Sequence, residues 1–187
     1  MSSEIKHILE GKRILLLGFG REGRSSYRFL RRYFPDMPLS IADRNPQAGE
    51  GFDELSRDAH LRLRFVEDYL SGSNDFDLII KSPGIPFDLL ADSYSPDIIS
   101  SQTDLFLRAY SKRVCGITGT KGKTTVTTLV HHLLEQAGRS LALSGNIGIP
   151  PFDLVPDLDE EAEVIFEMSS HQLEHIRLAP HIAVILN

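Results

Sequence analysis

The sequence of 187 residues predicts an α/β protein made of two successive parallel-sheet domains. Short apolar runs alternate with segments of helical periodicity, which is the pattern of βαβ units. Two of these apolar runs lead into glycine-rich turns that each open a helix, and the second turn begins a new series of strands. We therefore expect a first domain over residues 1–111 and a second over residues 112–187.

The composition favours a soluble, cytoplasmic protein that binds neither nucleic acid nor membranes, and we separately expect a monomer. The chain has 20 lysines and arginines and 26 acidic residues, for a formal charge of −6. Proteins that bind nucleic acids or anionic membranes need a cluster of positive charge, which this balance does not favour. The lone cysteine, Cys115, cannot form an internal disulfide, and it lies in an apolar run where a packed thiol is expected. No apolar stretch approaches the roughly 20 residues of a membrane-spanning helix.

In the first domain, we expect strands where short apolar or alternating runs occur. They cover residues 13–17, 39–42, 61–65 and 77–80. The run 61–65 alternates with period two, which is typical of a strand near a sheet edge. A helix should follow the first glycine turn and end at Pro35, and a shorter one should follow Ser100 and Ser101.

The second domain should contain a helix between Val126 and Ala137, stopped by Gly138. Its expected strands cover residues 114–117, 141–143, 163–166 and 182–186. Because the chain stops on the last of these strands, we expect the sheet to be incomplete. The sequence is therefore interpreted as a fragment of a longer protein.

The first glycine turn, residues 18–23, has the spacing G-x-G-x-x-G between a strand and a helix. Asp43 follows about 20 positions later, as in dinucleotide-binding sites. The glycines allow the backbone to approach a diphosphate, and the helix N-terminus offers it N–H groups. The pattern alone is compatible with a dinucleotide, with another diphosphate ligand or with no ligand.

The second glycine turn predicts binding of a nucleoside triphosphate. It comprises Gly119, Thr120, Lys121, Gly122, Lys123, Thr124 and Thr125. Backbone N–H groups would hold the phosphates, Lys123 would neutralise their charge, and the Thr124 hydroxyl would bind magnesium. The sequence departs from the usual P-loop pattern at Ile117, where a glycine is common.

Two further polar residues are candidates for this nucleotide site. Glu167 follows an apolar strand, where a carboxylate commonly binds the magnesium of the nucleotide, although a solvated carboxylate is the alternative. Asn146 lies in the sequence Gly-Asn-Ile-Gly and is equally compatible with a simple turn.

Several of these segments resemble the Mur ligases, the ATP-dependent enzymes that build the peptide of peptidoglycan precursors. The stretch 117–125 resembles the ATP loop of that family, which also lacks the early glycine. Residues 145–150 and 167–174 are similar to the family member that adds D-glutamate, and residues 18–23 and 82–85 agree with it.

The resemblance implies that the first domain is Rossmann-like and holds a UDP-sugar, and that the second is the N-terminal part of an ATP-binding domain. The implied substrate-binding residues are Gly18, Phe19, Gly20, Arg21, Gly23, Asp43, Arg44, Ser82, Pro83, Gly84, Asn146, Ser170 and Gln172. It also implies that residues 119–125 bind ATP and that Thr124 and Glu167 bind Mg²⁺. The implied catalytic residues are Lys123, Thr124, Glu167 and Asn146.

The implied reaction joins D-glutamate to UDP-N-acetylmuramoyl-L-alanine through an acyl phosphate, with release of ADP, in peptidoglycan synthesis. The resemblance also implies a C-terminal domain that takes in the amino acid and is absent from these 187 residues. The family's second magnesium site and its amino-acid site are expected beyond residue 187, so the chain alone should be inactive. Three alternatives remain open: a nicotinamide-binding redox or sensor module fused to a P-loop, a Mur ligase that adds another amino acid, and a non-catalytic UDP-sugar-binding protein.

Overall fold

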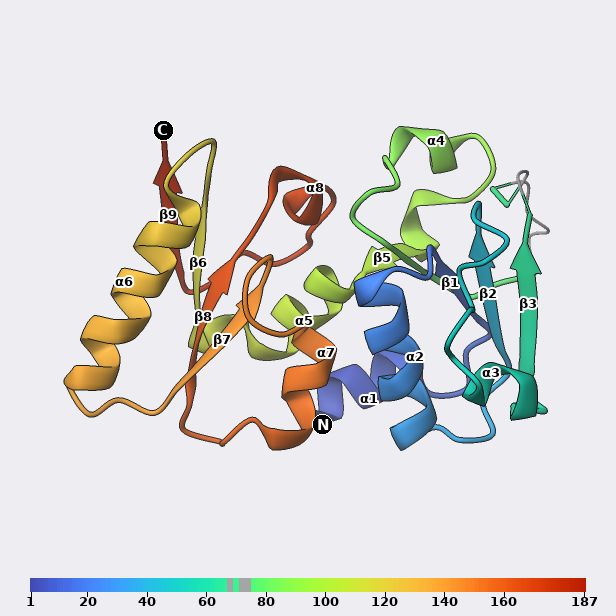
Figure 1. Ribbon diagram of the computed structural model, residues 1–187, viewed down its shortest axis with the longest axis horizontal. Coiled ribbons are helices and arrows are strands. Elements are labelled where there is room, and N and C mark those ends of the chain that lie inside the picture. The colour runs from blue at the N-terminus through green and yellow to red at the C-terminus, as the bar shows by residue number, and fades with distance from the viewer. Residues whose placement is uncertain (67–68, 71–74) are drawn as a thin grey trace. The chain divides into compact units, whose positions relative to one another are not determined.

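The computed structural model describes residues 1–66, 69–70 and 75–187 (Figure 1). Contacts divide the chain into two compact units, which we call the first unit (His7–Gln102) and the second unit (Met1–Lys6 with Thr103–Asn187). Helix α5 (Gln102–Tyr110) falls almost entirely in the second unit, where it packs on the second sheet. The rings of Phe106 and Phe166 meet edge to face there, with 5.7 Å between their centroids.

The first unit contains a five-stranded sheet of order β3-β2-β1-β4-β5, and every strand pair is parallel. Its strands are β1 (Ile14–Leu17), β2 (Leu39–Asp43), β3 (Leu61–Phe65), β4 (Leu78–Lys81) and β5 (Ile99–Ser101). The expected strands and the edge position of β3 are confirmed. The short strand β5 was not predicted, because two of its three residues are serines.

Helix α2 (Arg21–Tyr33) packs on β1 and ends just before Pro35, as expected. The other helices of this unit are short: α3 (Glu54–Arg57), α4 (Asp88–Ala91) and the 3-10 turn η1 (Pro96–Ile98). Leu15, Leu17 and Ile79 form a buried cluster with Leu90 and Tyr94 from the segment that follows β4. One face of the sheet is therefore closed by irregular chain.

The second unit has a parallel four-stranded sheet of order β7-β8-β6-β9. Its strands are β6 (Val114–Gly119), β7 (Leu141–Gly145), β8 (Glu163–Glu167) and β9 (Ile182–Leu186). Helix α6 (Lys123–Gln136) lies along β6 and β8 (Figure 1). The remaining elements are α1 (Ser3–Leu9), η2 (Ser111–Arg113), α7 (Pro151–Leu154), η3 (Val155–Asp157) and α8 (Ser170–Leu173).

The helix expected after the second turn is confirmed, and Gly138 follows it with φ of +77°. Its apolar residues are less buried than their spacing suggests, since Leu129 is 53% and Leu133 58% exposed. Ile185 on the edge strand β9 is 81% exposed. Within the described residues, no helix combines the length and apolar character needed to cross a membrane.

Candidate functional site: two glycine turns at the carboxyl ends of parallel strands

The first glycine turn joins β1 to α2 through very close packing. Gly23 has no room for a side chain, since a Cβ there would lie 2.1 Å from the carbonyl oxygen of Gly18. Gly18 has φ of +90°, and its Cβ would lie 2.7 Å from the Ser82 hydroxyl oxygen. These two glycines are therefore required by the fold itself.

Gly20 is different, because none of the residues that the structure describes requires a glycine there. It precedes α2 with an ordinary φ of −76°, and no heavy atom of those residues lies within 4 Å of where its Cβ would be. Gly84 has the same open surroundings. A missing side chain at such a position allows a ligand to approach the backbone, as the diphosphate interpretation of this turn requires.

Asp43 organises the first turn from the end of β2. Its two carboxylate oxygens accept the Phe19 N–H at 2.6 Å and the Asn45 N–H at 2.8 Å. The Phe19 ring is 1% exposed and packs against Tyr27 and Phe52, so this side chain belongs to the core. Any contact of Phe19 with a substrate therefore has to be made by its backbone.

Ser82 connects the segment after β4 to the first turn. Its N–H donates to the Leu17 carbonyl at 2.8 Å, and its hydroxyl donates to the Gly18 carbonyl at 3.0 Å. The structure thus brings Ser82, Pro83 and Gly84 to the carboxyl edge of the sheet that carries residues 18–23. Arg21 and Arg44 are exposed.

The second glycine turn is tightly packed at Gly119, where a Cβ would lie 2.3 Å from the Leu186 carbonyl oxygen, and open from Thr120 onward. Gly122 immediately precedes α6 in the left-handed conformation, and Thr120, Lys121 and Thr124 are exposed. The Lys123 ammonium donates to the Gly119 carbonyl at 2.8 Å and to the Thr120 carbonyl at 3.4 Å. The lysine thus lies back across the turn, at the N-terminus of a long helix where phosphates bind favourably.

Glu167 and Asn146 adjoin this turn in the sheet. Glu167 ends β8 and pairs in register with Ile117 of β6 and with Gly145 of β7. The Asn146 N–H donates to the Glu167 carbonyl, and its side-chain amide donates to Glu167 Oε1, both at 2.9 Å. Three adjacent strands therefore present the second turn, Glu167 and Asn146 at one edge.

The residues fit a divalent cation at this edge. Glu167 is fully buried, and its Oε2 atom has no hydrogen-bond partner among the residues that the structure describes. A buried carboxylate oxygen without a hydrogen-bond or metal partner lowers the stability of the fold. Carboxylate and hydroxyl oxygens are ligands that Mg²⁺ prefers, so a bound cation would provide such a partner. Thr124 in the first turn of α6 supplies such a hydroxyl.

Helix α8 follows Glu167 and begins with a reciprocal capping box. The Ser169 hydroxyl accepts the Gln172 N–H, and the Gln172 side-chain oxygen accepts the Ser169 N–H at 2.9 Å. Gln172 is 3% exposed, whereas Ser170 is exposed. In this structure Gln172 holds the helix end, and Ser170 is the accessible member of the predicted pair.

Sequence reasoning missed the buried Asp104, because an acidic residue in a short helix is ordinarily solvated. It is fully buried and accepts both the backbone N–H of Arg177 at 2.8 Å and its guanidinium at 2.6 Å. The pair fixes the chain beyond α8, where His175 has a positive φ of 66°. The sequence carries no signal for this long-range pairing.

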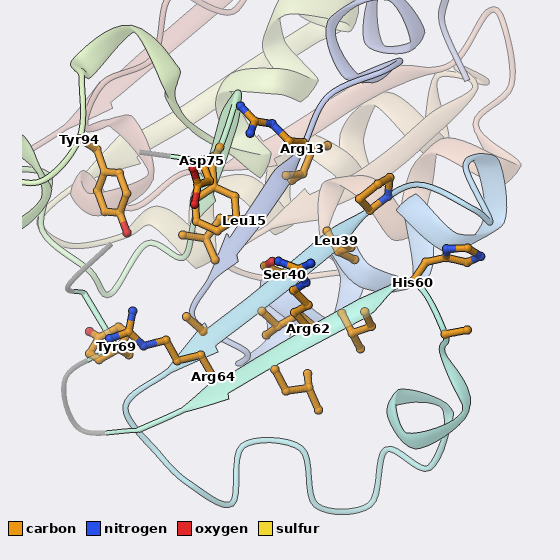
Figure 2. A pocket seen from close by; sticks show the side chains of 18 residues that line it. Arg13, Leu15, Leu39, Ser40, His60, Arg62, Arg64, Tyr69, Asp75 and Tyr94 are labelled. Carbon is orange, nitrogen blue, oxygen red and sulfur yellow. The ribbon is translucent and has the colours of Figure 1, made fainter. Parts of the chain in front are cut away.

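A groove of about 640 Å³ lies over strands β1, β2 and β3 of the first unit (Figure 2). Ser40 and Arg62 are in register on neighbouring strands, and Arg64 and Tyr69 lie at one end of the groove while His60 lies at the other. None of the predicted site residues lines it.

In each unit, a glycine turn joins a parallel strand to a helix, which is an arrangement typical of the class of nucleotide-binding α/β proteins. Comparison with known proteins identifies the family of this chain. Residues 117–187 match the model of the Mur ligase middle domain. A UDP-N-acetylmuramoylalanine--D-glutamate ligase of Ruminiclostridium cellulolyticum is 32% identical over 98% of this chain and 40% of the relative. The chain belongs to the Mur ligase family.

Two other relatives of similar identity have names that differ in the glutamate isomer. A UDP-N-acetylmuramoylalanine--D-glutamate ligase of Caldicellulosiruptor bescii is 34% identical over 96% of this chain and 40% of the relative. A UDP-N-acetylmuramoyl-L-alanine--L-glutamate ligase of Xylella fastidiosa is 35% identical with the same coverage. The chain thus spans about 40% of the length of these curated relatives.

Proposed function

We propose that the chain provides the UDP-sugar-binding and ATP-binding units of a ligase that joins D-glutamate to UDP-N-acetylmuramoyl-L-alanine in peptidoglycan precursor synthesis. The observation that carries this proposal is the arrangement of the second turn, Glu167 and Asn146 at the ends of three adjacent strands. It is suited to a triphosphate with a divalent cation. The substrates are those named for the D-glutamate relatives.

In the proposed reaction, a carboxylate oxygen of the L-alanyl group attacks the γ-phosphorus of ATP. The bond to the bridging oxygen breaks, ADP leaves, and the carboxylate becomes an acyl phosphate. The neutral amine of glutamate then attacks the acyl carbon, and the amide forms as inorganic phosphate leaves and the nitrogen loses a proton. The protein contributes mainly positioning and neutralisation of charge.

In the second unit, Lys123 is suited to stabilise the charge that develops on the transferred phosphoryl group. Its ammonium can exchange the carbonyls of Gly119 and Thr120 for phosphate oxygens, because both lie in the turn that would receive the nucleotide. Bound Mg²⁺, held by Thr124 and Glu167, would supply further neutralisation of phosphate charge. Asn146 keeps the Glu167 carboxylate in place.

In the first unit, residues 18–23 and 82–84 are proposed to bind the diphosphate of the UDP-sugar, with Asp43 and Arg44 near the uridine. Gly20 supports this role, since its open surroundings leave space for a ligand that the fold does not otherwise need. Contacts of Asn146, Ser170 and Gln172 with the substrate remain predictions. So do the domain limits of 1–111 and 112–187, the cytoplasmic location and the monomeric state.

The glutamate isomer is the finer part of the proposal. Relatives at similar identity carry names with D-glutamate and with L-glutamate. We favour the D isomer because residues 145–150 and 167–174 resemble the D-glutamate-adding member.

The test is ligation by the protein that contains this chain, supplied with ATP, Mg²⁺ and UDP-N-acetylmuramoyl-L-alanine. Phosphate release and amide product are expected with D-glutamate, and not with L-glutamate, L-lysine or no amino acid. Release that requires another amino acid would contradict the assignment. The 187 residues alone are expected to form no product, because the D-glutamate relatives are much longer. Product from that chain would overturn this expectation.

A thermal-shift comparison separates the proposal from a nicotinamide-binding module. UDP-N-acetylmuramoyl-L-alanine should stabilise the chain and NADH should not, because a ligand stabilises a protein only if it binds the folded state. Stabilisation by NADH alone would favour the redox alternative.

A further inference from the structure

Asp104 and Arg177 form an ion pair whose acidic partner is completely withdrawn from water. The Asp104 side chain is 0% exposed, and its carboxylate accepts the Arg177 N–H at 2.8 Å and the Arg177 guanidinium at 2.6 Å. A buried charge loses its hydration, so apolar residues packed in place of such a pair are often as stable or more stable. The pair is therefore a candidate for selecting one conformation of the chain, a role that apolar packing would not fill.

Asp104 lies on a well-packed part of the second unit. It is in the first turn of α5, and Phe106, two residues further on, packs edge to face on Phe166 of β8. Both rings are fully buried. Because β8 ends one residue later at Glu167, Asp104 is held in place relative to the proposed cation site.

The segment that contains α8 is attached to the second unit on both sides. Before the helix, the Met168 N–H donates to the Ile117 carbonyl at 2.9 Å. After the helix, Arg177 is bonded to Asp104. The backbone of His175 between them has φ of 66°, a left-handed conformation that is strained for a residue other than glycine and persists where the surrounding structure holds it. The ion pair holds the chain two residues beyond this strained position.

Ser170, the first residue of α8, is the exposed polar group that this attachment places. It follows Glu167 by three residues, so the two Cα atoms lie within about 11 Å of each other. The helix lies beyond the end of β8 (Figure 1). In the proposed reaction the L-alanyl carboxylate attacks the γ-phosphate beside the cation, so that end of the substrate has to approach this edge. The Ser170 hydroxyl is therefore able to reach it.

We propose that Asp104 is a positioning residue for the ligation, because its pair with Arg177 holds α8 where the Ser170 hydroxyl meets the L-alanyl end of the substrate. This inference rests on the proposed function, which supplies the substrate and its contact with Ser170. Precise placement of a group that contacts a substrate requires support from residues that do not touch the substrate. A charge buried in α5 thereby affects the reaction without contacting a reactant.

The first measurement tests the positioning itself, by amide hydrogen exchange in the chain of 187 residues. Asp104→Asn keeps the shape of the side chain but opposes a donor to Arg177, so residues 172–177 should exchange about tenfold faster. Exchange in α6 should be unchanged. Unchanged exchange of residues 172–177 would overturn the proposal. If Asp104→Asn fails to fold, Arg177→Met takes its place, since it removes the guanidinium and keeps the backbone N–H.

Two further variants serve as controls. Arg177→Lys keeps a cation and the backbone bond to Asp104, so the exchange of residues 172–177 should stay within about twofold of the unchanged chain. Glu163→Gln breaks the exposed ion pair with Arg139 at the other end of β8 and should leave these residues unaffected. Faster exchange in Glu163→Gln would show that loss of any ion pair in the second unit loosens the segment, which would overturn the specific role of Asp104.

The second measurement is the KM of each substrate for the protein that contains this chain. Asp104→Asn should raise the KM for UDP-N-acetylmuramoyl-L-alanine about tenfold and leave the KM for ATP within about twofold. Arg177→Lys and Glu163→Gln should leave both KM values within about twofold. An equal rise in both KM values for Asp104→Asn would overturn the proposal, because it would show that Asp104 only supports the second unit.

A double-mutant cycle tests whether Asp104 acts through Ser170. Ser170→Ala alone should raise the KM for UDP-N-acetylmuramoyl-L-alanine about tenfold, and Asp104→Asn should then add less than about twofold. Multiplied effects in the double variant, or an unchanged KM in Ser170→Ala, would overturn the proposal. Absence of ligation by the unchanged protein is a different result. It would contradict the proposed function and the catalytic part of this inference, whereas the hydrogen exchange reports separately on whether Asp104 holds α8.

Discussion

The two glycine turns follow strands in similar ways, yet the fold uses their glycines differently. In the first turn, Gly18 and Gly23 approach each other so closely that a side chain at either would meet neighbouring atoms. In the second, a Cβ at Gly119 would lie 2.3 Å from the Leu186 carbonyl oxygen, whereas one at Gly122 would have its nearest neighbour, the Leu186 side chain, at 3.9 Å. Both turns therefore begin with a glycine that the fold requires, but the last glycine of the motif is tightly packed in the first turn and open in the second.

This difference separates residues that the fold requires from residues that ligand binding would require. Gly23 and Asp43 are fully explained by contacts within the chain, whereas Gly20, Lys123 and the buried Glu167 are not. Substitutions at the first group should therefore change stability. Those at the second should change ligand affinity with little effect on stability.

The largest effect is expected for Gly23→Ala. Its Cβ would overlap the Gly18 carbonyl, so the free energy of unfolding should fall by at least about 3 kcal/mol, or folding should fail. Gly122→Ala, which has space but a left-handed backbone, should lose only about 1–2 kcal/mol. Urea unfolding of both variants measures the difference. Equal losses would contradict the distinction between the turns.

The next effect should appear in nucleotide binding. Lys123→Met removes the cation that lies over the second turn, so the dissociation constant for Mg-ATP should rise roughly 100-fold. The free energy of unfolding should change by less than about 1 kcal/mol, because among its described contacts the lysine is bonded only to the carbonyls of Gly119 and Thr120 in its own turn. Calorimetric titration measures the affinity, and Lys121→Met serves as the control. A large loss of stability with unchanged affinity would refute the prediction.

Asp43→Asn tests the first turn with a smaller change. The amide can accept only one of the two N–H groups of Phe19 and Asn45 and opposes the other with its own donor. A loss of about 1–3 kcal/mol is expected from urea unfolding. If stability is unchanged and UDP affinity alone falls, Asp43 is a ligand contact and not a support of the turn.

The smallest expected effect is a loss of folding stability at acidic pH. Burial raises the pKa of Asp58, but hydrogen bonds from Arg31, from the His60 N–H and from Tyr27 outweigh it and hold the pKa below its usual value. This stabilisation is present above the unfolded pKa of about 4 and is lost as the pH falls through the lower folded value. Urea midpoints of the unchanged chain should therefore fall on acidification below about pH 4.

Arg31→Met is the matched variant for the acid measurement. Without the guanidinium, burial should dominate at Asp58 and raise its folded pKa, so acidification should destabilise this variant less than the unchanged chain. The same dependence on pH in both proteins would show that the ion pair contributes nothing to acid sensitivity.

Most of the sheet architecture could be predicted from the sequence, because buried parallel strands such as 14–17 and 78–81 are short apolar runs. Strand β5 was missed because Ser100 and Ser101 are polar, and their burial depends on neighbouring strands. The packing of Phe106 on Phe166, which joins helix α5 to the second unit, could not be predicted because it brings together residues far apart in sequence.

The site was predictable where local motifs define it, as in both glycine turns and Glu167. It was less predictable where tertiary packing decides exposure. Phe19 lies within the motif yet its ring belongs to the core, and Gln172 is engaged in a helix cap. Lys81 and Asp104 are charged residues whose burial no local pattern indicates.

The most direct measurement is a crossed titration of UDP and Mg-ATP into the chain and into two variants, Gly20→Val and Lys123→Met. Gly20→Val fills the open position of the first turn, so it should abolish UDP binding and retain ATP binding. Lys123→Met should do the reverse. The account of two separate phosphate-binding turns would be contradicted if one variant abolished the binding of both ligands. It would also be contradicted if neither variant weakened the binding of the ligand assigned to its turn.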